Sequence, residues 1–494
     1  MVKAHTAASA IAVWAVALAL TAPAPALAQN SAQPPAQSSA QSLELGRVRE
    51  EMKQLQRTYE ERMQALEKRL TEAEARTGKA EQSASKAEQT ATQAEAAASA
   101  ASHRTGENAF NPAISLILQG TYARTSQDPN NFAITGSVPS GGEVGPPKRS
   151  FGLGESELAI SANIDPYFRG VFIGSFTPEN TVDIEEAYFQ TLALSKGFTL
   201  KAGRFLSGIG YQNEIHQHAW DFQDAPLPYK AFLGGRYQQD GVQLRWLAPT
   251  DLFLELGGEL ASGQSFPGND RNKNGVGSAA LFAHIGGDIG ESYAWRTGLS
   301  YLHTAAANRS YSDVDALGNP VTDSFTGRAR MWIVDGVLKW APNGNATQMN
   351  VKLQGEYFRV KQDGTLTYDD TAQAVPQFGV PLAGPFRTAQ SGWYTQAVWQ
   401  FMPRWRVGYR YDTVRHGTLD NGIVSNGLGP TAADFPLLAD YNPSRNTAMV
   451  DFSPSEFSRL RLQFSADKSR MGVTDNQVML QYIQSIGPHG AHKF

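Results

Sequence analysis

The sequence predicts an all-β transmembrane barrel of about 16 antiparallel strands, preceded by a cleaved signal peptide and a short N-terminal α-helical coiled coil. Three observations lead to this fold class. From residue 108 onward, segments of about ten residues alternate apolar and polar side chains, and short and long connections between them alternate. No apolar run of roughly 18 residues lies outside the N-terminus, which excludes a helical membrane protein.

Composition fits this class and excludes several others. The 494 residues include 46 glycines, 10% aromatic residues and no cysteine. The lack of cysteine excludes a disulfide scaffold, a Cys-ligated metal centre and a thiol nucleophile. The formal net charge of −4 gives no general attraction to nucleic acid, so we expect no nucleic-acid partner.

Residues 1–28 have the features of a signal peptide. Lys3 supplies a positive charge, residues 11–20 form an apolar core, and Ala26-Leu27-Ala28 matches a small-x-small cleavage site. Ten apolar residues are too few to span a bilayer, so we expect cleavage after Ala28, with an uncleaved anchor as the alternative. Export places the mature protein in the periplasm or outer membrane of a Gram-negative bacterium.

The next two segments are a flexible linker, residues 29–42, and a helical coiled coil, residues 43–107. The linker consists of Ala, Gln, Ser and Pro with one Asn. The helix carries apolar residues at heptad spacing, namely Leu45, Val48, Met52, Leu55, Tyr59 and Leu66. The seam is interrupted by Arg62 and Arg69. We expect a periplasmic stalk that assembles a homotrimer, by analogy with porin-type barrels; a solvated helix without a partner is the alternative.

Residues 108–494 form the predicted outer-membrane barrel. In the clearest segment, Trp405, Val407 and Tyr409 lie on one face and Arg406 and Arg410 on the other. A soluble sandwich would show the same alternation, but it has no reason to place all its long loops at one end. The expected long loops include 125–154, 207–239, 263–277, 305–327, 361–390 and 416–443. The sixteen expected strands are 113–124, 155–164, 167–176, 182–193, 197–206, 240–248, 251–262, 278–288, 292–304, 328–341, 346–360, 391–402, 404–415, 444–453, 456–467 and 476–487.

A barrel of this size predicts a pore. Side chains do not fill a sixteen-stranded barrel, so we expect a water-filled channel for passive diffusion of small hydrophilic solutes. An open tube would leak, and residues 207–239 resemble the third loop of general porins, which folds inward as a constriction. Packing over the barrel mouth or against a neighbouring subunit is the alternative. The charged and imidazole residues of this candidate constriction loop are Glu214, His216, His218, Asp221, Asp224, Lys230 and Arg236.

The polar faces of the strands predict a basic lining. Rings of arginine or lysine favour anions, so a mild anion preference is expected; a solvated wall without selectivity is the alternative. Acidic residues on the same faces are Glu255, Glu259, Glu356, Asp412 and Asp467. The expected pore-lining basic ladder comprises Arg404, Arg406, Arg410, Arg459, Arg461, Arg245 and Lys201.

Metal and enzyme chemistry have weaker signals. His216 and His218 could bind zinc, but a zinc site usually needs three or four ligands, and the sequence places no third one. No cofactor other than zinc is suggested. The motifs G-x-S-x-G and H-E-x-x-H are absent from the sequence, so we expect no enzyme activity.

The layout of signal peptide, heptad segment, barrel and terminal Phe494 resembles outer-membrane porins of the phosphate-selective porin O/P type. Three segments, NEIHQHAWDFQDAPLPYKAFLGG, NPSRNTAMVDFSPSEFSRLRLQFS and GPHGAHKF, resemble a coiled-coil-bearing family also labelled zinc-regulated TonB-dependent outer membrane receptor. The resemblance implies that the barrel-assembly machinery reads Phe494, although the last expected strand ends at residue 487.

The chain departs in two ways from the families that it resembles. Its Arg and Lys clustering is too sparse to carry phosphate specificity over from the phosphate-selective porins. It also lacks features of TonB-dependent receptors. Such a receptor has a plug domain inside a barrel of about 22 strands, whereas residues 29–107 read as a tether and a helix and only sixteen strands are expected. Passive diffusion is therefore favoured. The alternatives are a zinc-linked outer-membrane uptake receptor and a structural envelope barrel tethered by its coiled coil.

Overall fold

The computed structural model describes residues 50, 53, 112–141, 144–178 and 180–487. The chain divides into two units, residues 1–107 and 108–494. In the first unit, Glu50 and Lys53 are helical and exposed. The predicted signal peptide, linker and Phe494, and all of the predicted coiled coil but these two residues, lie outside the described residues. Within the described part, no helix has both the length and the apolar character needed to cross a membrane.

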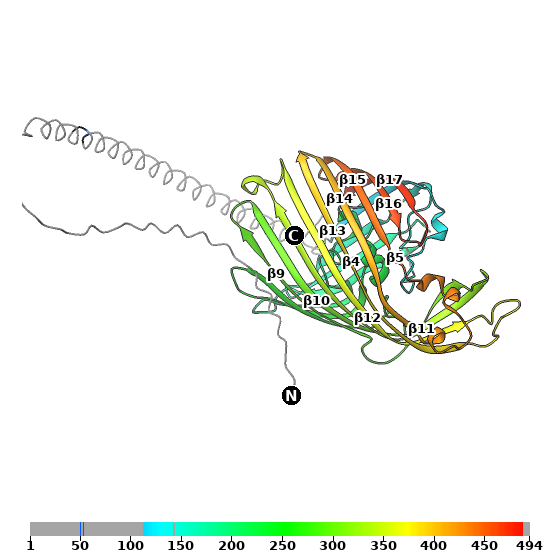
Figure 1. Ribbon diagram of the computed structural model, residues 1–494. Helices are drawn as coiled ribbons and strands as arrows, with labels where there is room; N and C mark the ends of the chain where they lie inside the picture. Colours follow the sequence, from blue (N-terminus) through cyan, green and yellow to red (C-terminus); the bar gives the residue numbers. More distant parts are fainter. Residues whose placement is uncertain (1–49, 51–52, 54–111, 142–143, 179, 488–494) are drawn as a thin grey trace, which may run out of the picture. The chain divides into compact units, whose positions relative to one another are not determined.

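The second unit is one antiparallel sheet that closes on itself (Figure 1). Each strand pairs with its neighbours in sequence, and β1 closes the ring by pairing with β17. β2 and β3 both pair with β1, at residues 120–123 and 113–117, so they are two parts of one interrupted strand. The predicted sixteen-stranded barrel is thereby confirmed. The strands are β1(Ala113–Thr125), β2(Ser150–Leu153), β3(Ser156–Asn163), β4(Phe168–Phe176), β5(Val182–Thr191), β6(Phe198–Leu206), β7(Gln238–Leu247), β8(Phe253–Ala261), β9(Ser278–Ile289), β10(Tyr293–Val314), β11(Pro320–Trp340), β12(Asn350–Asp369), β13(Leu382–Met402), β14(Trp405–Asn421), β15(Ser444–Ser455), β16(Ser458–Lys468) and β17(Asp475–Ile486).

One side of the barrel is taller than predicted. β10 to β14 contain 17 to 22 residues each, and they are the long green to orange arrows of Figure 1. The expected loops 305–327, 361–390 and 416–443 are therefore partly strand, which corrects the prediction. The reason is that apolar side chains at this end face inward, where they form a buried cluster, instead of outward toward lipid. Members of the cluster include Val321, Phe325, Leu366, Tyr368 and Phe386.

Short helices lie in the connections. They are η1(Pro129–Asn131), η2(Gln217–Ala219), α2(Leu227–Leu233), η3(Pro342–Gly344), α3(Gly422–Ser425), η4(Ala432–Asp434) and η5(Pro436–Leu438). Segments around η4, η5 and α3 contribute Phe435, Leu438 and Ile423 to the cluster inside the tall strands. The long connections therefore fold inward over the tall wall.

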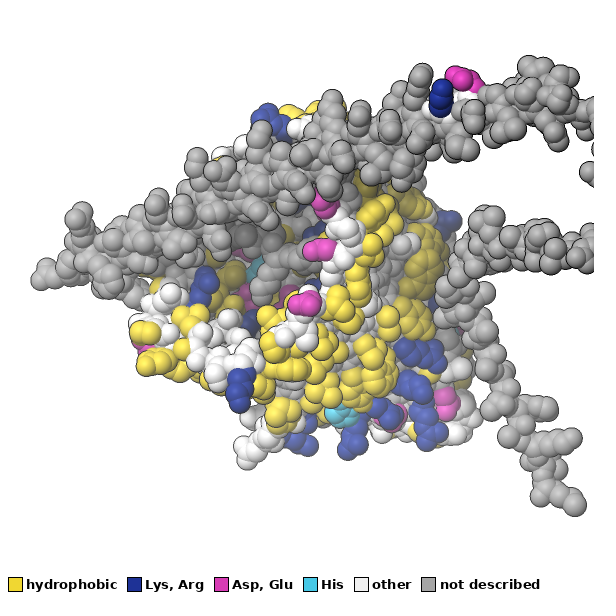
Figure 2. All heavy atoms as spheres, turned by 90° about the vertical axis from the view of Figure 1, so that its left-hand side faces the viewer, with side chains coloured by type: hydrophobic (Ala, Val, Ile, Leu, Met, Phe, Trp, Pro, Cys, Tyr) yellow, Lys and Arg dark blue, Asp and Glu magenta, His cyan; other side chains and the backbone are white. Residues whose placement is uncertain are grey.

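The barrel has an apolar exterior and a polar interior. On β16, Leu462 is 48% exposed, while its neighbours Arg461 and Gln463 are 1% exposed. β17 repeats the pattern, with Leu480 exposed and Gln481 fully buried. Figure 2 shows hydrophobic side chains covering much of the outer surface of the strands. This inside-out arrangement matches a barrel whose outer face contacts lipid.

A hydrophobic core fills part of the barrel interior. The connection between β6 and β7, residues 207–237, is named here the inner loop, and it includes η2 and α2. Its buried residues Leu227, Phe232 and Ile209 belong to one cluster with wall residues such as Ile333 and Phe358. The aromatic residues of the predicted constriction loop are therefore buried against the inner face of the barrel wall.

Candidate functional site

Two buried carboxylates of the barrel wall hold the start of the inner loop. Glu259 on β8 accepts hydrogen bonds from the Ser207 hydroxyl at 2.6 Å and the Gly208 amide at 2.8 Å. Glu356 on β12 accepts from the amides of residues 211 and 212 at 3.2 and 3.0 Å. Because each acceptor is buried and has several donors, the start of the loop is tied to two parts of the wall that lie four strands apart.

Glu356 also organises two tyrosines. The hydroxyl of Tyr229 on α2 donates to Glu356 at 3.0 Å, and that of Tyr394 on β13 donates at 2.6 Å. Gly210 passes close to this carboxylate with a φ of +68°, and a Cβ there would lie 2.4 Å from Glu356 Oε2. Only glycine fits this position without displacement of the loop.

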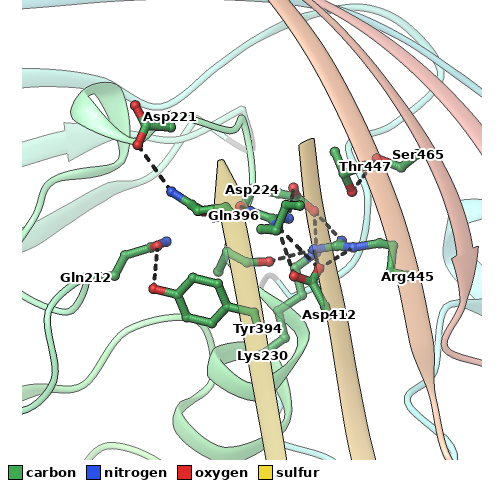
Figure 3. Close-up of polar contacts among 12 residues, drawn as sticks. Gln212, Asp221, Asp224, Lys230, Tyr394, Gln396, Asp412, Arg445, Thr447 and Ser465 are labelled. Carbon is green, nitrogen blue, oxygen red and sulfur yellow. Dashed lines mark hydrogen bonds and ion pairs between the residues drawn. The ribbon is translucent and has the colours of Figure 1, made fainter. Parts of the chain in front are cut away.

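The middle of the inner loop is held by two aspartates (Figure 3). Asp221 accepts from Lys352 Nζ at 2.9 Å, Gln396 Nε2 at 3.1 Å and Arg406 Nη1 at 3.2 Å. These partners lie on β12, β13 and β14. A single loop carboxylate therefore bridges three neighbouring strands.

Asp224 is the centre of a second set of ion pairs. It lies 3.0 Å from Lys230 Nζ and 3.0 Å from Arg410 Nη2, and it also pairs with Arg445 Nη1. Arg445 pairs in turn with Asp412 at 2.9 Å. Arg410, Arg445 and Asp412 are at most 1% exposed, so these charges are compensated almost entirely by each other.

The pKa values of both loop aspartates are lowered. Burial by itself would raise the pKa of Asp221, but Lys352 and Arg406 outweigh it and hold the pKa well below its usual value. Burial likewise opposes ionisation of Asp224, and the pKa of that carboxyl is nevertheless lowered by Arg445, Lys230 and Arg410. Both groups are therefore ionised anchors at neutral pH.

The residues of the predicted basic ladder occupy different surroundings. Arg406 and Arg461 both pair with Asp451, Arg461 through its Nε at 2.8 Å. Arg459 donates to the backbone oxygen of His218, and Arg461 donates to that of Trp220 at 2.9 Å. The strand arginines near the inner loop are thus part of its attachment.

The other three ladder residues lie apart from this group. Arg245 on β7 pairs with Glu214 of the inner loop and lies 3.4 Å from Glu255. Lys201 on β6 is buried, with its Nζ 4.4 Å from the centre of the Tyr188 ring. Arg404 is exposed in the short turn between β13 and β14 and lies outside the strands. The structure therefore does not bring all seven residues into one row.

A cluster of carboxylates and imidazoles lies on another part of the wall. His216 Nδ1 is 2.9 Å from Glu185 Oε2 and 3.3 Å from Glu157 Oε2, and its Nε2 is 3.1 Å from Glu186 Oε2. His218 Nδ1 is 3.0 Å from Glu157 Oε1. We name these five residues the carboxylate–imidazole cluster.

Arg236, at the end of the inner loop, borders this cluster. It pairs with Glu185 at 2.9 Å and with Glu155 at 3.2 Å. Burial alone would lower the pKa of His216, but hydrogen bonds to Glu157, Glu185 and Glu186 outweigh it and hold that pKa well above its usual value. The cluster therefore ties the loop to β3 and β5 through charged groups.

Charge is distributed unevenly around the interior. β14, which carries Arg406 and Arg410, is seven strands from β5 in the ring of sixteen, whereas β16, which carries Arg459 and Arg461, is three strands from β3. Four carboxylates lie close together at β3 and β5, namely Glu155, Glu157, Glu185 and Glu186. Beside β12 to β16, seven basic groups face six acidic groups; they are Lys230, Lys352, Arg406, Arg410, Arg445, Arg459 and Arg461 against Asp221, Asp224, Glu356, Asp412, Asp451 and Asp467.

Several residues of the site were missed by sequence reasoning. Arg445 and Asp451 lie on the polar face of β15, a correctly predicted strand. The alternation of polar and apolar residues along that strand could therefore have predicted that both side chains face the interior. Glu185 and Glu186 are consecutive and both buried, which strict alternation forbids. A register shift in the β4–β5 pairing explains this, because Ile173 pairs with Glu186 whereas the next residue pairs with Ile184. Such a bulge turns both carboxylates inward.

Comparison with known proteins gives distant similarities. No protein-family model matches the chain. An uncharacterized protein of Aquifex aeolicus (strain VF5) is 29% identical over 416 residues, which cover 78% of this chain and 81% of that protein.

Similar solved structures are outer-membrane proteins. A loop L8 deletion mutant of OmpT, an outer membrane protein of Vibrio cholerae, covers 76% of this chain and 99% of its own, with 9% identity and a TM-score of 0.47. An anion-selective porin from Comamonas acidovorans has the same coverage, 10% identity and a TM-score of 0.45. The outer membrane channel DcaP of Acinetobacter baumannii has 13% identity and a TM-score of 0.41, and covers 76% of this chain and 97% of its own. The sequence identities and TM-scores of these structures are too low to assign a function to this chain.

Proposed function

We propose that the protein is an outer-membrane porin, a water-filled channel for passive diffusion of small hydrophilic solutes that the inner loop narrows. The observation that supports this most strongly is a closed ring of sixteen strands with apolar side chains outside and charged side chains inside. A ring of that size is wider than its own side chains can fill. Hydrogen bonds and ion pairs from the loop to the wall support its role as the constriction.

A mild anion preference is part of the proposal. The basic excess of one group beside β12 to β16 would favour anions slightly, and the carboxylates at β5 with the arginines of β14 would create a transverse field across the constriction. Most of the strand arginines are paired with aspartates. The seven basic groups therefore contribute less to anion preference than seven unpaired charges would. Phosphate and chloride are therefore the first permeant anions to test.

The cellular setting is proposed on sequence grounds. We infer an outer-membrane location in a Gram-negative cell, with residues 43–107 in the periplasm as a coiled coil and a homotrimer as the assembly. Insertion by the barrel-assembly machinery would use Phe494. No enzyme activity is expected.

Swelling of proteoliposomes tests the proposal. Purified refolded protein in vesicles is diluted into isosmotic solutions of neutral sugars and amino acids of increasing size. We expect swelling that is fast for small solutes and declines with solute size, without saturation. Vesicles that contain folded barrel but swell no faster than empty vesicles would contradict it.

A second candidate function is a zinc-linked uptake receptor. The convergence of His216 with Glu157 and Glu185 favours it, because these residues offer nitrogen and oxygen ligands at one point. A receptor predicts saturable zinc transport, whereas a diffusion channel predicts a flux proportional to concentration. Transport rates over a range of zinc concentrations separate the two.

A further inference from the structure

The carboxylate–imidazole cluster has the donor atoms of a metal site. Glu157, Glu185 and His216 each offer one ligand atom, and these three atoms lie within 4.8 Å of one another. They come from β3, β5 and the inner loop, so a common ligand would connect three separate elements. Two carboxylate oxygens with one imidazole nitrogen form a mixed set that suits zinc and similar ions better than calcium or magnesium.

The two distances from His216 Nδ1 to the carboxylate oxygens fit a small tetrahedral ion. His216 Nδ1 lies 2.9 Å from Glu185 Oε2 and 3.3 Å from Glu157 Oε2. Bonds of about 2.0–2.1 Å in a tetrahedron place neighbouring ligand atoms about 3.3 Å apart. Small side-chain adjustments would therefore bring all three atoms to bonding distance, and the fourth position would remain open to water.

A second layer of hydrogen bonds orients each ligand. His216 Nε2 lies 3.1 Å from Glu186, which would accept its proton when Nδ1 binds the metal. Ser175 donates to the other oxygen of Glu185, and His218 contacts the other oxygen of Glu157 at 3.0 Å. A carboxylate behind a ligating histidine is the arrangement that fixes tautomer and ring orientation in metal sites.

We propose that Glu157, Glu185 and His216 bind a divalent transition-metal ion, with zinc as the preferred ion, and that this ion fastens the inner loop to β3 and β5. Arg236 contacts the same Glu185 oxygen at 2.9 Å, so it must give up that contact on binding. Its second partner, Glu155, remains available at 3.2 Å. The inference stands whether or not the barrel conducts.

Zinc binding to the purified, refolded full-length chain without a histidine tag tests the site directly. Competition with a chromophoric zinc indicator should give one ion per chain with micromolar affinity or better. His216→Ala and the isosteric Glu185→Gln should each weaken binding at least 100-fold. His303→Ala, on β10, and the double variant His489→Ala/His492→Ala should bind as the wild type does.

A second readout follows the loop itself. Zinc should slow trypsin cleavage after Arg236 in the wild type at least fivefold, whereas calcium should not. Migration of the unheated protein in detergent gels checks that each variant is folded. The absence of saturable zinc binding by the wild type, or wild-type affinity in folded His216→Ala, would overturn the proposal.

Discussion

Asp224 is the residue whose removal should release the inner loop most clearly. It pairs with Lys230, Arg410 and Arg445, whose side chains are at most 5% exposed. Removal of one partner from a buried ion pair costs about 3–5 kcal/mol, because the remaining charges are left uncompensated. At about 1.4 kcal/mol per factor of ten, the lower figure would shift the loop toward its released state about 100-fold.

Limited proteolysis measures this shift, because Lys230 is buried and Arg236 is paired with Glu155 and Glu185, so we expect trypsin to cut after either residue only when the loop leaves the wall. Asp224→Ala should be cleaved at least ten times faster than the wild type, and Asp224→Asn should lie between them. The matched control is Asp363→Ala, which breaks the 2.9 Å pair with Arg330. Both of its partners are nearly half exposed, so the cost is at most about 1 kcal/mol. Wild-type resistance of folded Asp224→Ala would refute the reasoning.

Three further predictions concern pH, selectivity and the outer surface. Burial opposes the lowered pKa values of Asp221 and Asp224, but Lys352 and Arg406 hold down the first, and Arg445, Lys230 and Arg410 the second. The stabilisation by these two aspartates is therefore present above the unfolded pKa of about 3.9 and is lost only as pH falls through the lower folded values. Samples incubated at each pH and then tested with trypsin should keep the inner loop uncut from pH 7 to about pH 4. Cleavage that appears between pH 7 and 5 would contradict this. The double variant Arg406→Ala/Arg461→Ala removes the guanidinium partners of Asp451; reversal potentials in a salt gradient should shift toward cations, and an unchanged potential would exclude these arginines from selectivity. Leu462→Arg on the lipid-facing side of β16 should lower the free energy of unfolding in vesicles by about 2–4 kcal/mol, whereas Leu317→Arg in the exposed turn after β10 should change it little; equal effects would argue against a lipid-facing β16.

The sequence was sufficient for the barrel and its strand order. In a membrane barrel the exposed face is apolar, so alternation in segments such as Leu460 to Phe464 identified both the strand and its outer side. The tall hairpins were missed because Phe325 and Leu366 face inward at the end of the barrel where connections fold over them. A strand whose apolar side chains face the interior shows the same alternation as one whose apolar side chains face lipid. The alternation alone therefore does not distinguish the two orientations.

The site was only partly predictable. The aromatic content of residues 207–239 indicated a loop that needs a surface to bury against, and its charged residues could be named. Their partners depend on register and on one bulge. The meeting of His216 with Glu157 and Glu185 joins residues up to 59 positions apart on β3, β5 and the loop. Pairing of the arginines with Asp451 and Asp412 likewise required the positions of neighbouring strands.

Single-channel recording in a planar bilayer tests the central claim most directly. The account predicts stepwise conductance from the purified, refolded wild-type protein, with larger or noisier steps for Asp224→Ala because its constriction is released. A silent bilayer from protein that is folded by gel migration would contradict a water-filled channel.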